Sequence, residues 1–148
     1  MAGKFPGENE FREFNVKIDS AASQLVFGKW PTEVLYSGFE IGVKIKTGLP
    51  LVKNSAIQNS PVKDVFSICL PMNKDDNYGR CSWDETAVLV AVKGHAPYYS
   101  LQPGKIIVND NGSNSWDKKG KNQYYLVEKL PHTQVEELIN NLIQHQPK

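Results

Sequence analysis

Residue types that build metal and thiol centres are scarce in this 148-residue sequence. The two cysteines, Cys69 and Cys81, are too few for a disulfide framework and lack the CxxC spacing of a zinc site. The three histidines, His95, His132 and His145, are scattered without a zinc-like pattern. The sequence therefore predicts neither a zinc site nor thiol chemistry, and it leaves the redox compartment open.

The chain also lacks an excess of one charge and a long apolar run. Its 17 lysines and arginines nearly balance 16 aspartates and glutamates, which gives a formal net charge of +1 and no global reason to expect nucleic acid. No segment approaches the length of a membrane span, and the opening MAGKFPGENEFREF has no apolar core of a signal peptide. We therefore expect neither a nucleic-acid partner nor a membrane partner.

The residues that are present predict an α/β fold made of short strands and packed helices. Near the N-terminus, apolar and polar side chains alternate over residues 14–18, which is the period of a half-buried strand. Such a strand places Glu13 and Asn15 on one face. A helix over residues 20–27 and a strand over residues 32–37 follow, and this strand, helix, strand order is typical of an α/β domain.

The rest of the chain alternates between further short elements and polar connections. Asp75 and Asp76 lack the spacing of an EF-hand loop, so a solvated turn is favoured over a calcium loop. Trp116 either covers a pocket or packs locally, and packing is favoured. We expect helices over residues 39–45, from Ser60–Pro61 to Pro71 and from Thr133 to Ile143, strands over 98–101, 105–108 and 123–128, a Pro103–Gly104 turn, and exposed loops over 46–59 and 109–122.

The stretch RCSWDETAVLVAVKG, residues 80–94, predicts a buried helix with a carboxylate at its start. Ser82 and Glu85 have the spacing of a capping box, so Ser82 is the predicted N-cap and Asp84 falls in the first turn. Residues 87–92 are all apolar, which predicts burial on every side. An aspartate at this position either only stabilises the helix end or, as an ionised group, binds a metal or sugar hydroxyls.

Three stretches occur in a specific order along the chain: MAGKFPG at the start, EFN at residues 13–15 followed by DSAASQLVF, and SWDETAVLVAVKG. Together they resemble the C-terminal half of the inosine-uridine preferring nucleoside hydrolases, calcium-dependent enzymes that cleave the N-glycosidic bond of ribonucleosides. The later YYLVEKL and HTQVEELINNLI also look like the end of that family, so the resemblance covers most of the chain. It implies one domain over residues 1–148 with the open α/β fold of that half.

The resemblance also implies a set of site residues. Met1 matches an active-site methionine, and Glu13 and Asn15 match a pair that holds ribose hydroxyls. Asp84 matches an aspartate that binds both Ca²⁺ and the ribose. An ionised carboxylate is a suitable hard oxygen ligand for Ca²⁺. Ala2 stands where the family has a glycine. The implied ligand is a nucleoside or another ribose-containing small molecule.

Trp83 departs from the family pattern. Members that cleave purine nucleosides and inosine often have a histidine just before the calcium-binding aspartate, and this histidine protonates the departing base. Tryptophan has no proton to supply at accessible pH, although its ring can stack on a base or line the pocket. A core position for Trp83 is the alternative.

A second departure concerns catalysis. The family takes most of its calcium ligands, and the base that activates water, from an aspartate-rich D-x-D-x-x-x-D-D motif, and this sequence contains no such motif. The chain then corresponds to a truncated member that is inactive alone, with any export signal in the missing half and the cytoplasm slightly favoured. The alternative is a noncatalytic sugar-binding or nucleoside-binding module, or a structural remnant that self-associates. A homo-oligomer is expected, because lost neighbouring elements expose apolar surface.

Overall fold

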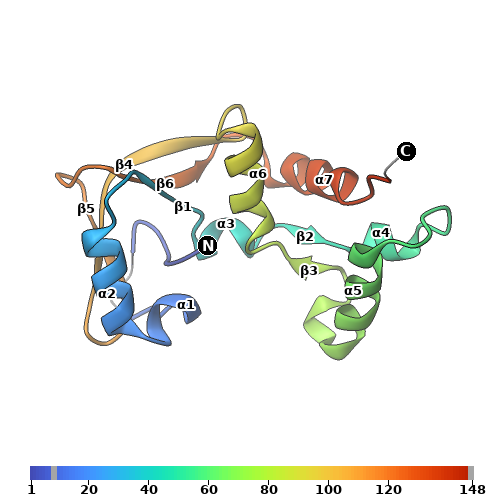
Figure 1. The fold of residues 1–148 in the computed structure, drawn as a ribbon, viewed down its shortest axis with the longest axis horizontal. Helices are drawn as coiled ribbons and strands as arrows, with labels where there is room; N and C mark the ends of the chain where they lie inside the picture. Colours follow the sequence, from blue (N-terminus) through green and yellow to red (C-terminus); the bar gives the residue numbers. More distant parts are fainter. Residues whose placement is uncertain (8–9, 147–148) are drawn as a thin grey trace.

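A four-stranded mixed sheet organises one half of the computed structural model, which describes residues 1–7 and 10–146 (Figure 1). The strand order is β1-β6-β4-β5, in which β1 runs parallel to β6 and the other two pairs are antiparallel. The architecture is mixed α/β, as the sequence predicts. The strands are β1 (Val34–Tyr36), β4 (Tyr99–Val108), β5 (Asn114–Asp117) and β6 (Gln123–Glu128).

Helices α1 and α2 lie beside this sheet at one end of an elongated molecule, whereas a small ribbon leads to α4 and α5 at the other end (Figure 1). The antiparallel ribbon consists of β2 (Lys46–Thr47) and β3 (Arg80–Cys81). None of the described helices is long and apolar enough to cross a bilayer. The helices are α1 (Phe14–Lys17), α2 (Ser20–Lys29), α3 (Phe39–Gly42), α4 (Leu49–Lys53), α5 (Pro61–Cys69), α6 (Glu85–Lys93) and α7 (His132–Leu142).

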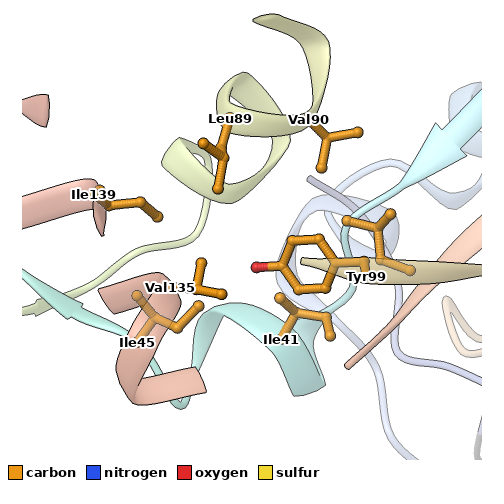
Figure 2. Packing of buried hydrophobic residues seen from close by; sticks show 8 residues of the cluster. Ile41, Ile45, Leu89, Val90, Tyr99, Val135 and Ile139 are labelled. Atoms are coloured by element: carbon orange, nitrogen blue, oxygen red, sulfur yellow. The ribbon is translucent and has the colours of Figure 1, made fainter. Parts of the chain in front are cut away.

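An aliphatic core fills the space between α3, α6, α7 and the sheet (Figure 2). Tyr99 of β4 inserts its ring into this core and is only 2% exposed. The Tyr99 hydroxyl points toward aliphatic side chains, and it has no hydrogen-bond partner among the residues that the structure describes. The buried members of this cluster are Ile41, Ile45, Leu89, Val90, Tyr99, Leu126, Val135 and Ile139.

An aromatic core lies on the other part of the sheet and explains the position of Trp116. Phe5 stacks on Tyr125 with ring centroids 4.9 Å apart, and the Trp116 ring meets Phe5 edge to face at 5.3 Å. Trp116 Nε1 donates a hydrogen bond to the carbonyl of Pro103 at 3.2 Å. Local packing of Trp116 is therefore confirmed.

Two predictions for this part of the chain are wrong: Pro103–Gly104 forms no turn, and the loop predicted over residues 109–122 contains strand β5. Strand β4 continues through Gly104 and pairs with β6 on one side and β5 on the other. A Cβ at Gly104 would overlap the Trp116 indole, so the glycine allows the ring to cross the strand. The chain turns at Asn111–Gly112 between β4 and β5, with Gly112 at φ +82°.

The predicted strand over residues 14–18 is also wrong, because this segment forms the short helix α1. The Glu13 side chain caps the helix by accepting hydrogen bonds from the backbone N–H groups of Asn15 and Val16. Only Val16 of the alternating apolar residues is buried, whereas Phe14 and Ile18 are exposed. The alternation over so few residues therefore does not report a strand.

The loop predicted over residues 46–59 contains β2 and α4. Asn140 of α7 organises its start, because its amide accepts a hydrogen bond from Gly48 N at 3.1 Å and donates one to the Lys46 carbonyl at 3.0 Å. Gly48 itself has φ +92°, a conformation that glycine adopts without strain. These contacts join residues that are 92 and 94 positions apart in the sequence, which the local pattern does not reveal.

Helix α6 has one buried side rather than the predicted burial all round. Thr86, Leu89 and Val90 are buried, but Val88 is 59% exposed and Val92 is 77% exposed. The predicted capping box is wrong as well: Asp84 occupies the N-cap position, and the Ser82 hydroxyl bonds the Glu85 carboxylate instead of a backbone N–H. Apolar side chains of α2 and α5 are also largely exposed, namely Leu25, Val26, Val62 and Val65.

Candidate functional site

A cavity of about 460 Å³ lies where the N-terminal segment, α1, α3 and the start of α6 meet. All five residues that the sequence predicts for the site line this cavity, although they come from three separate stretches of the chain. Its volume falls within the range of about 300–1,000 Å³ that is usual for small-molecule sites. The lining residues are Met1, Phe11, Arg12, Glu13, Phe14, Asn15, Lys17, Phe39, Arg80, Trp83 and Asp84.

Glu13 is buried at the wall of the cavity, with 3% of its surface exposed. Its Oε2 accepts hydrogen bonds from Gly3 N at 3.1 Å and Val16 N at 3.2 Å, and its Oε1 accepts one from Asn15 N at 3.0 Å. A carboxylate offers about four acceptor positions, two on each oxygen, so one position on Oε1 remains for a ligand hydroxyl. Glu13 thus both orders the surrounding backbone and offers limited capacity to a sugar.

Asn15 lies beside Met1 and not on a strand face shared with Glu13. Its Nδ2 donates to the Met1 carbonyl at 3.3 Å and contacts Met1 Sδ at 3.4 Å. Its Oδ1 accepts no hydrogen bond from the residues that the structure describes. The side chain is exposed, so this oxygen is available as an acceptor for a hydroxyl group of a ligand.

Asp84 lines the cavity at the start of α6 and exposes its carboxylate to solvent, with 80% of the side chain exposed. Its Oδ1 lies 3.7 Å from the Met1 amino nitrogen. The carboxylate makes no side-chain cap of α6. Helix-end stabilisation by a direct capping hydrogen bond therefore does not account for this residue, and its oxygens are accessible to a ligand.

An aromatic wall closes another side of the cavity. The rings of Trp83 and Phe39 stack with centroids 5.2 Å apart at 28°, and Phe11 packs on Phe39 at 4.7 Å. Gly42 permits this arrangement, since a Cβ there would lie 2.7 Å from Trp83 Cε3. Trp83 is half-buried, so it combines a packing contact with a surface that lines the cavity. An exposed aromatic surface of this kind can stack on a nucleobase.

The residues present do not fit a complete calcium site. Among the described ranges, no group of three or more histidine, cysteine, aspartate or glutamate side chains could hold a metal ion. Calcium takes about 6–8 oxygen ligands, whereas Asp84 supplies one accessible carboxylate and Glu13 has most of its acceptor capacity occupied. Asp84 can serve as one ligand, and the others would have to come from outside these residues.

Several other titratable residues have structural partners. Asp76 is buried and pairs with Arg80 at 2.8 Å, so the predicted solvated turn is wrong for this side chain. Cys69 and Cys81 are both free thiols, and Cys81 Sγ accepts a hydrogen bond from Lys46 Nζ at 3.1 Å. These groups stabilise the β2–β3 region and its neighbours rather than forming a second ligand cluster.

Sequence reasoning missed six lining residues, which are aromatic or basic. The basic ones, Arg12, Lys17 and Arg80, resemble ordinary surface charges in the sequence. A signal for two of them exists, because Arg12 directly precedes Glu13 and Arg80 lies three positions before Trp83. The missed aromatic residues are Phe11, Phe14 and Phe39.

No protein-family model matches the chain, and a search of curated proteins finds no significant match. The interpretation of the cavity therefore depends on its own residues and on the resemblance of the sequence motifs.

Proposed function

We propose that this chain supplies the ribose-binding side of a nucleoside hydrolase site, and that its ligand is a nucleoside or a related ribose-containing molecule. In the proposed arrangement Asn15 and Glu13 hold sugar hydroxyls and Asp84 contributes a calcium ligand. Met1 lines the pocket, and Trp83 stacks on the base.

The convergence of the predicted residues on one cavity is the observation that carries this proposal. Glu13 and Asn15 lie about seventy residues before Trp83 and Asp84 in the sequence, and Met1 lies about eighty before them, yet all five line the same 460 Å³ space. The chemistry of the walls agrees with the ligand, because a nucleoside combines a flat base with a polyhydroxylated sugar. Aromatic rings suit the base, and unoccupied oxygen acceptors suit the hydroxyls.

The proposed catalytic role is incomplete within this sequence. Hydrolysis of an N-glycosidic bond requires a base that activates water. No lining residue of the cavity is left for that role, because Glu13 is occupied by backbone N–H groups and Asp84, the remaining carboxylate, is assigned to the calcium ion. An aspartate-rich segment from outside these residues would supply that base and most calcium ligands. We therefore expect the chain alone to bind nucleosides but to release little or no ribose.

Two measurements test the proposal. Titration calorimetry with adenosine and inosine should detect binding that Asn15→Ala and Asp84→Asn each weaken, because each change removes an oxygen acceptor or a charge from the cavity. A calcium-dependent ribose-release assay on the same nucleosides should show no activity above background.

Matched controls separate a site effect from a general effect of substitution. Asp64→Asn changes an exposed aspartate near the start of α5, and Asn141→Ala changes another exposed asparagine, on α7. Both controls should bind like the unmodified chain. Nucleoside binding that is absent, or that is insensitive to Asn15→Ala and Asp84→Asn, would contradict the proposal, as would ribose release that survives Asp84→Ala.

A second candidate function is structural, and an exposed apolar face favours it. Val88 and Val92 of α6, together with Leu142 of α7, border an almost entirely apolar groove of about 260 Å³. We propose a second copy of this chain as the partner, since a net charge of +1 causes little mutual repulsion. This is the homo-oligomer that the sequence predicts, and it is compatible with ligand binding elsewhere.

Light scattering on eluting protein tests this second candidate. The double variant Val88→Lys/Val92→Lys should convert a dimer or larger assembly to monomer, because charges in an apolar interface must be desolvated. Leu25→Lys on α2 is the control, since it changes another exposed apolar residue, on a helix that lies away from α6, and should leave the assembly intact (Figure 1). An unmodified chain that is monomeric at all concentrations would refute self-association.

A further inference from the structure

Three basic side chains line the cavity and face only one accessible carboxylate. Arg12 and Lys17 belong to the α1 region, and Arg80 comes from β3. The Glu13 carboxylate is buried and accepts three backbone N–H groups, which leaves Asp84 as the accessible anion among the lining residues. Arg80 is already ion-paired with the buried Asp76, so Arg12 and Lys17 are the lining cations that have no ion pair among the described residues, and neutral nucleoside binding does not require them.

The basic side chains have N–H donors that their existing contacts do not use. Arg12 is exposed and makes no hydrogen bond or ion pair with residues in the described ranges 1–7 and 10–146. The Lys17 ammonium lies 5.9 Å from the Phe14 ring centroid, a distance at which a cation–π contact is weak. Arg80 uses Nη1 for Asp76 at 2.8 Å, but a guanidinium has five N–H donors, so others remain. An anionic ligand can thus be bound without breaking existing pairs.

We propose that the cavity binds nucleoside 5′-monophosphates in preference to nucleosides. This inference rests on the proposed function, and it identifies the ligand class of the same site. The aromatic wall of Trp83 and Phe39 takes the base, Asn15 and Glu13 take the ribose, and the basic side chains take the phosphate. A phosphate monoester carries a charge of about −1.5 to −2 at neutral pH and three acceptor oxygens, which suits arginine donors in particular.

Asp84 and the basic side chains have opposite effects on a bound phosphate. The balance between them determines whether the monophosphate or the nucleoside binds more tightly. Asp84 repels a phosphate, but it is one exposed carboxylate against two cations that have no ion pair among the described residues, and its charge is screened by solvent. A ligand oriented with its sugar toward Asp84 and its phosphate toward Arg12 and Lys17 satisfies both sets of groups. The same distribution gives a neutral nucleoside no contact with the cations.

Calorimetric titration of the full chain with adenosine and with adenosine 5′-monophosphate, at matched ionic strength, measures this preference. We expect the monophosphate to bind about tenfold more tightly, because charge-assisted hydrogen bonds to phosphate are the added interaction. The double variant Arg12→Gln/Lys17→Gln should remove most of that difference. Lys121→Gln, which removes an exposed lysine that does not line the cavity, should preserve the difference.

The outcomes separate this inference from the proposed function. Adenosine that binds as tightly as its monophosphate, or a preference that survives Arg12→Gln/Lys17→Gln, overturns the phosphate site and leaves the nucleoside site in place. Failure of both ligands to bind overturns the two together. Inorganic phosphate that binds as tightly as the monophosphate, while adenosine does not bind, overturns the nucleotide assignment. Circular dichroism of each variant confirms that the exposed substitutions leave the fold unchanged.

Discussion

Replacing Tyr99 with phenylalanine should stabilise the protein, because it removes a buried hydroxyl that has no partner among the described residues. The hydroxyl lies in the aliphatic core formed by α3, α6 and α7, and burial raises the pKa of Tyr99 well above its usual range (Figure 2). Leaving such a group without a hydrogen bond costs about 1–3 kcal/mol. The phenylalanine avoids this cost, but it also loses the packing contacts of the oxygen, which reduces the gain in stability. We expect Tyr99→Phe to raise the free energy of unfolding by about 1 kcal/mol.

Urea denaturation followed by circular dichroism measures this change, with Tyr36→Phe as the matched control. Tyr36 is also a buried tyrosine whose pKa is raised by burial, but its hydroxyl hydrogen-bonds Gln123 Oε1 at 3.3 Å. Removing that hydroxyl should lower stability by about 1 kcal/mol, so the two variants should move in opposite directions. A Tyr99→Phe variant that loses as much stability as Tyr36→Phe would refute the reasoning.

Three further predictions concern single contacts. Burial raises the pKa of Glu40, so folding favours its protonated form, and the stability of the unmodified chain falls as pH rises through that pKa. In urea titrations, Glu40→Gln should therefore be more stable relative to the unmodified chain at pH 7 than at pH 4. Equal effects of the substitution at both pH values would contradict this. Asn140→Ala should lower the free energy of unfolding by about 1–3 kcal/mol in urea titrations, because it leaves the buried Gly48 N–H without its acceptor. An unchanged free energy of unfolding would mean that another group accepts this hydrogen bond. Gly42→Ala should displace the Trp83 ring and shift its fluorescence at a cost of about 1–3 kcal/mol, whereas an unchanged spectrum would count against the close contact.

The sequence predicts best those elements whose ends carry local signals. Helix α2 begins after Asp19, whose side chain accepts a hydrogen bond from Ala22 N, and helix α5 begins after Ser60, which caps it in the same way. Strand β6 has the predicted bounds. In each case the residues that determine the element lie within it or next to it.

Elements determined by distant contacts escape such reasoning. The continuity of β4 through Gly104 depends on the Trp116 ring, and the start of the 46–59 segment depends on Asn140 of α7. Helix α1 fails for another reason: Glu13 is an unusual cap, so its sequence gives no standard start signal. The apolar pattern of α6 also overstates burial, since Val88 and Val92 face solvent in this chain.

The candidate site shows the same division. The motif resemblance points to Met1, Glu13, Asn15, Trp83 and Asp84, and these residues do line one cavity. The strand geometry expected to bring Glu13 and Asn15 together is wrong, because the residues meet through a helix cap. The basic residues escape prediction because a lysine or arginine near the surface has no local pattern that distinguishes a ligand contact from ordinary solvation.

The Glu13 cap has a consequence for how a ligand would bind. One carboxylate joins Gly3 of the N-terminal segment to Asn15 and Val16 of α1, so two walls of the cavity are held together before any ligand arrives. Binding then loses little conformational entropy from these walls, and the affinity depends mainly on the contacts made. Backbone order parameters of Gly3 and Asn15 should accordingly be high in the free protein and nearly unchanged on binding.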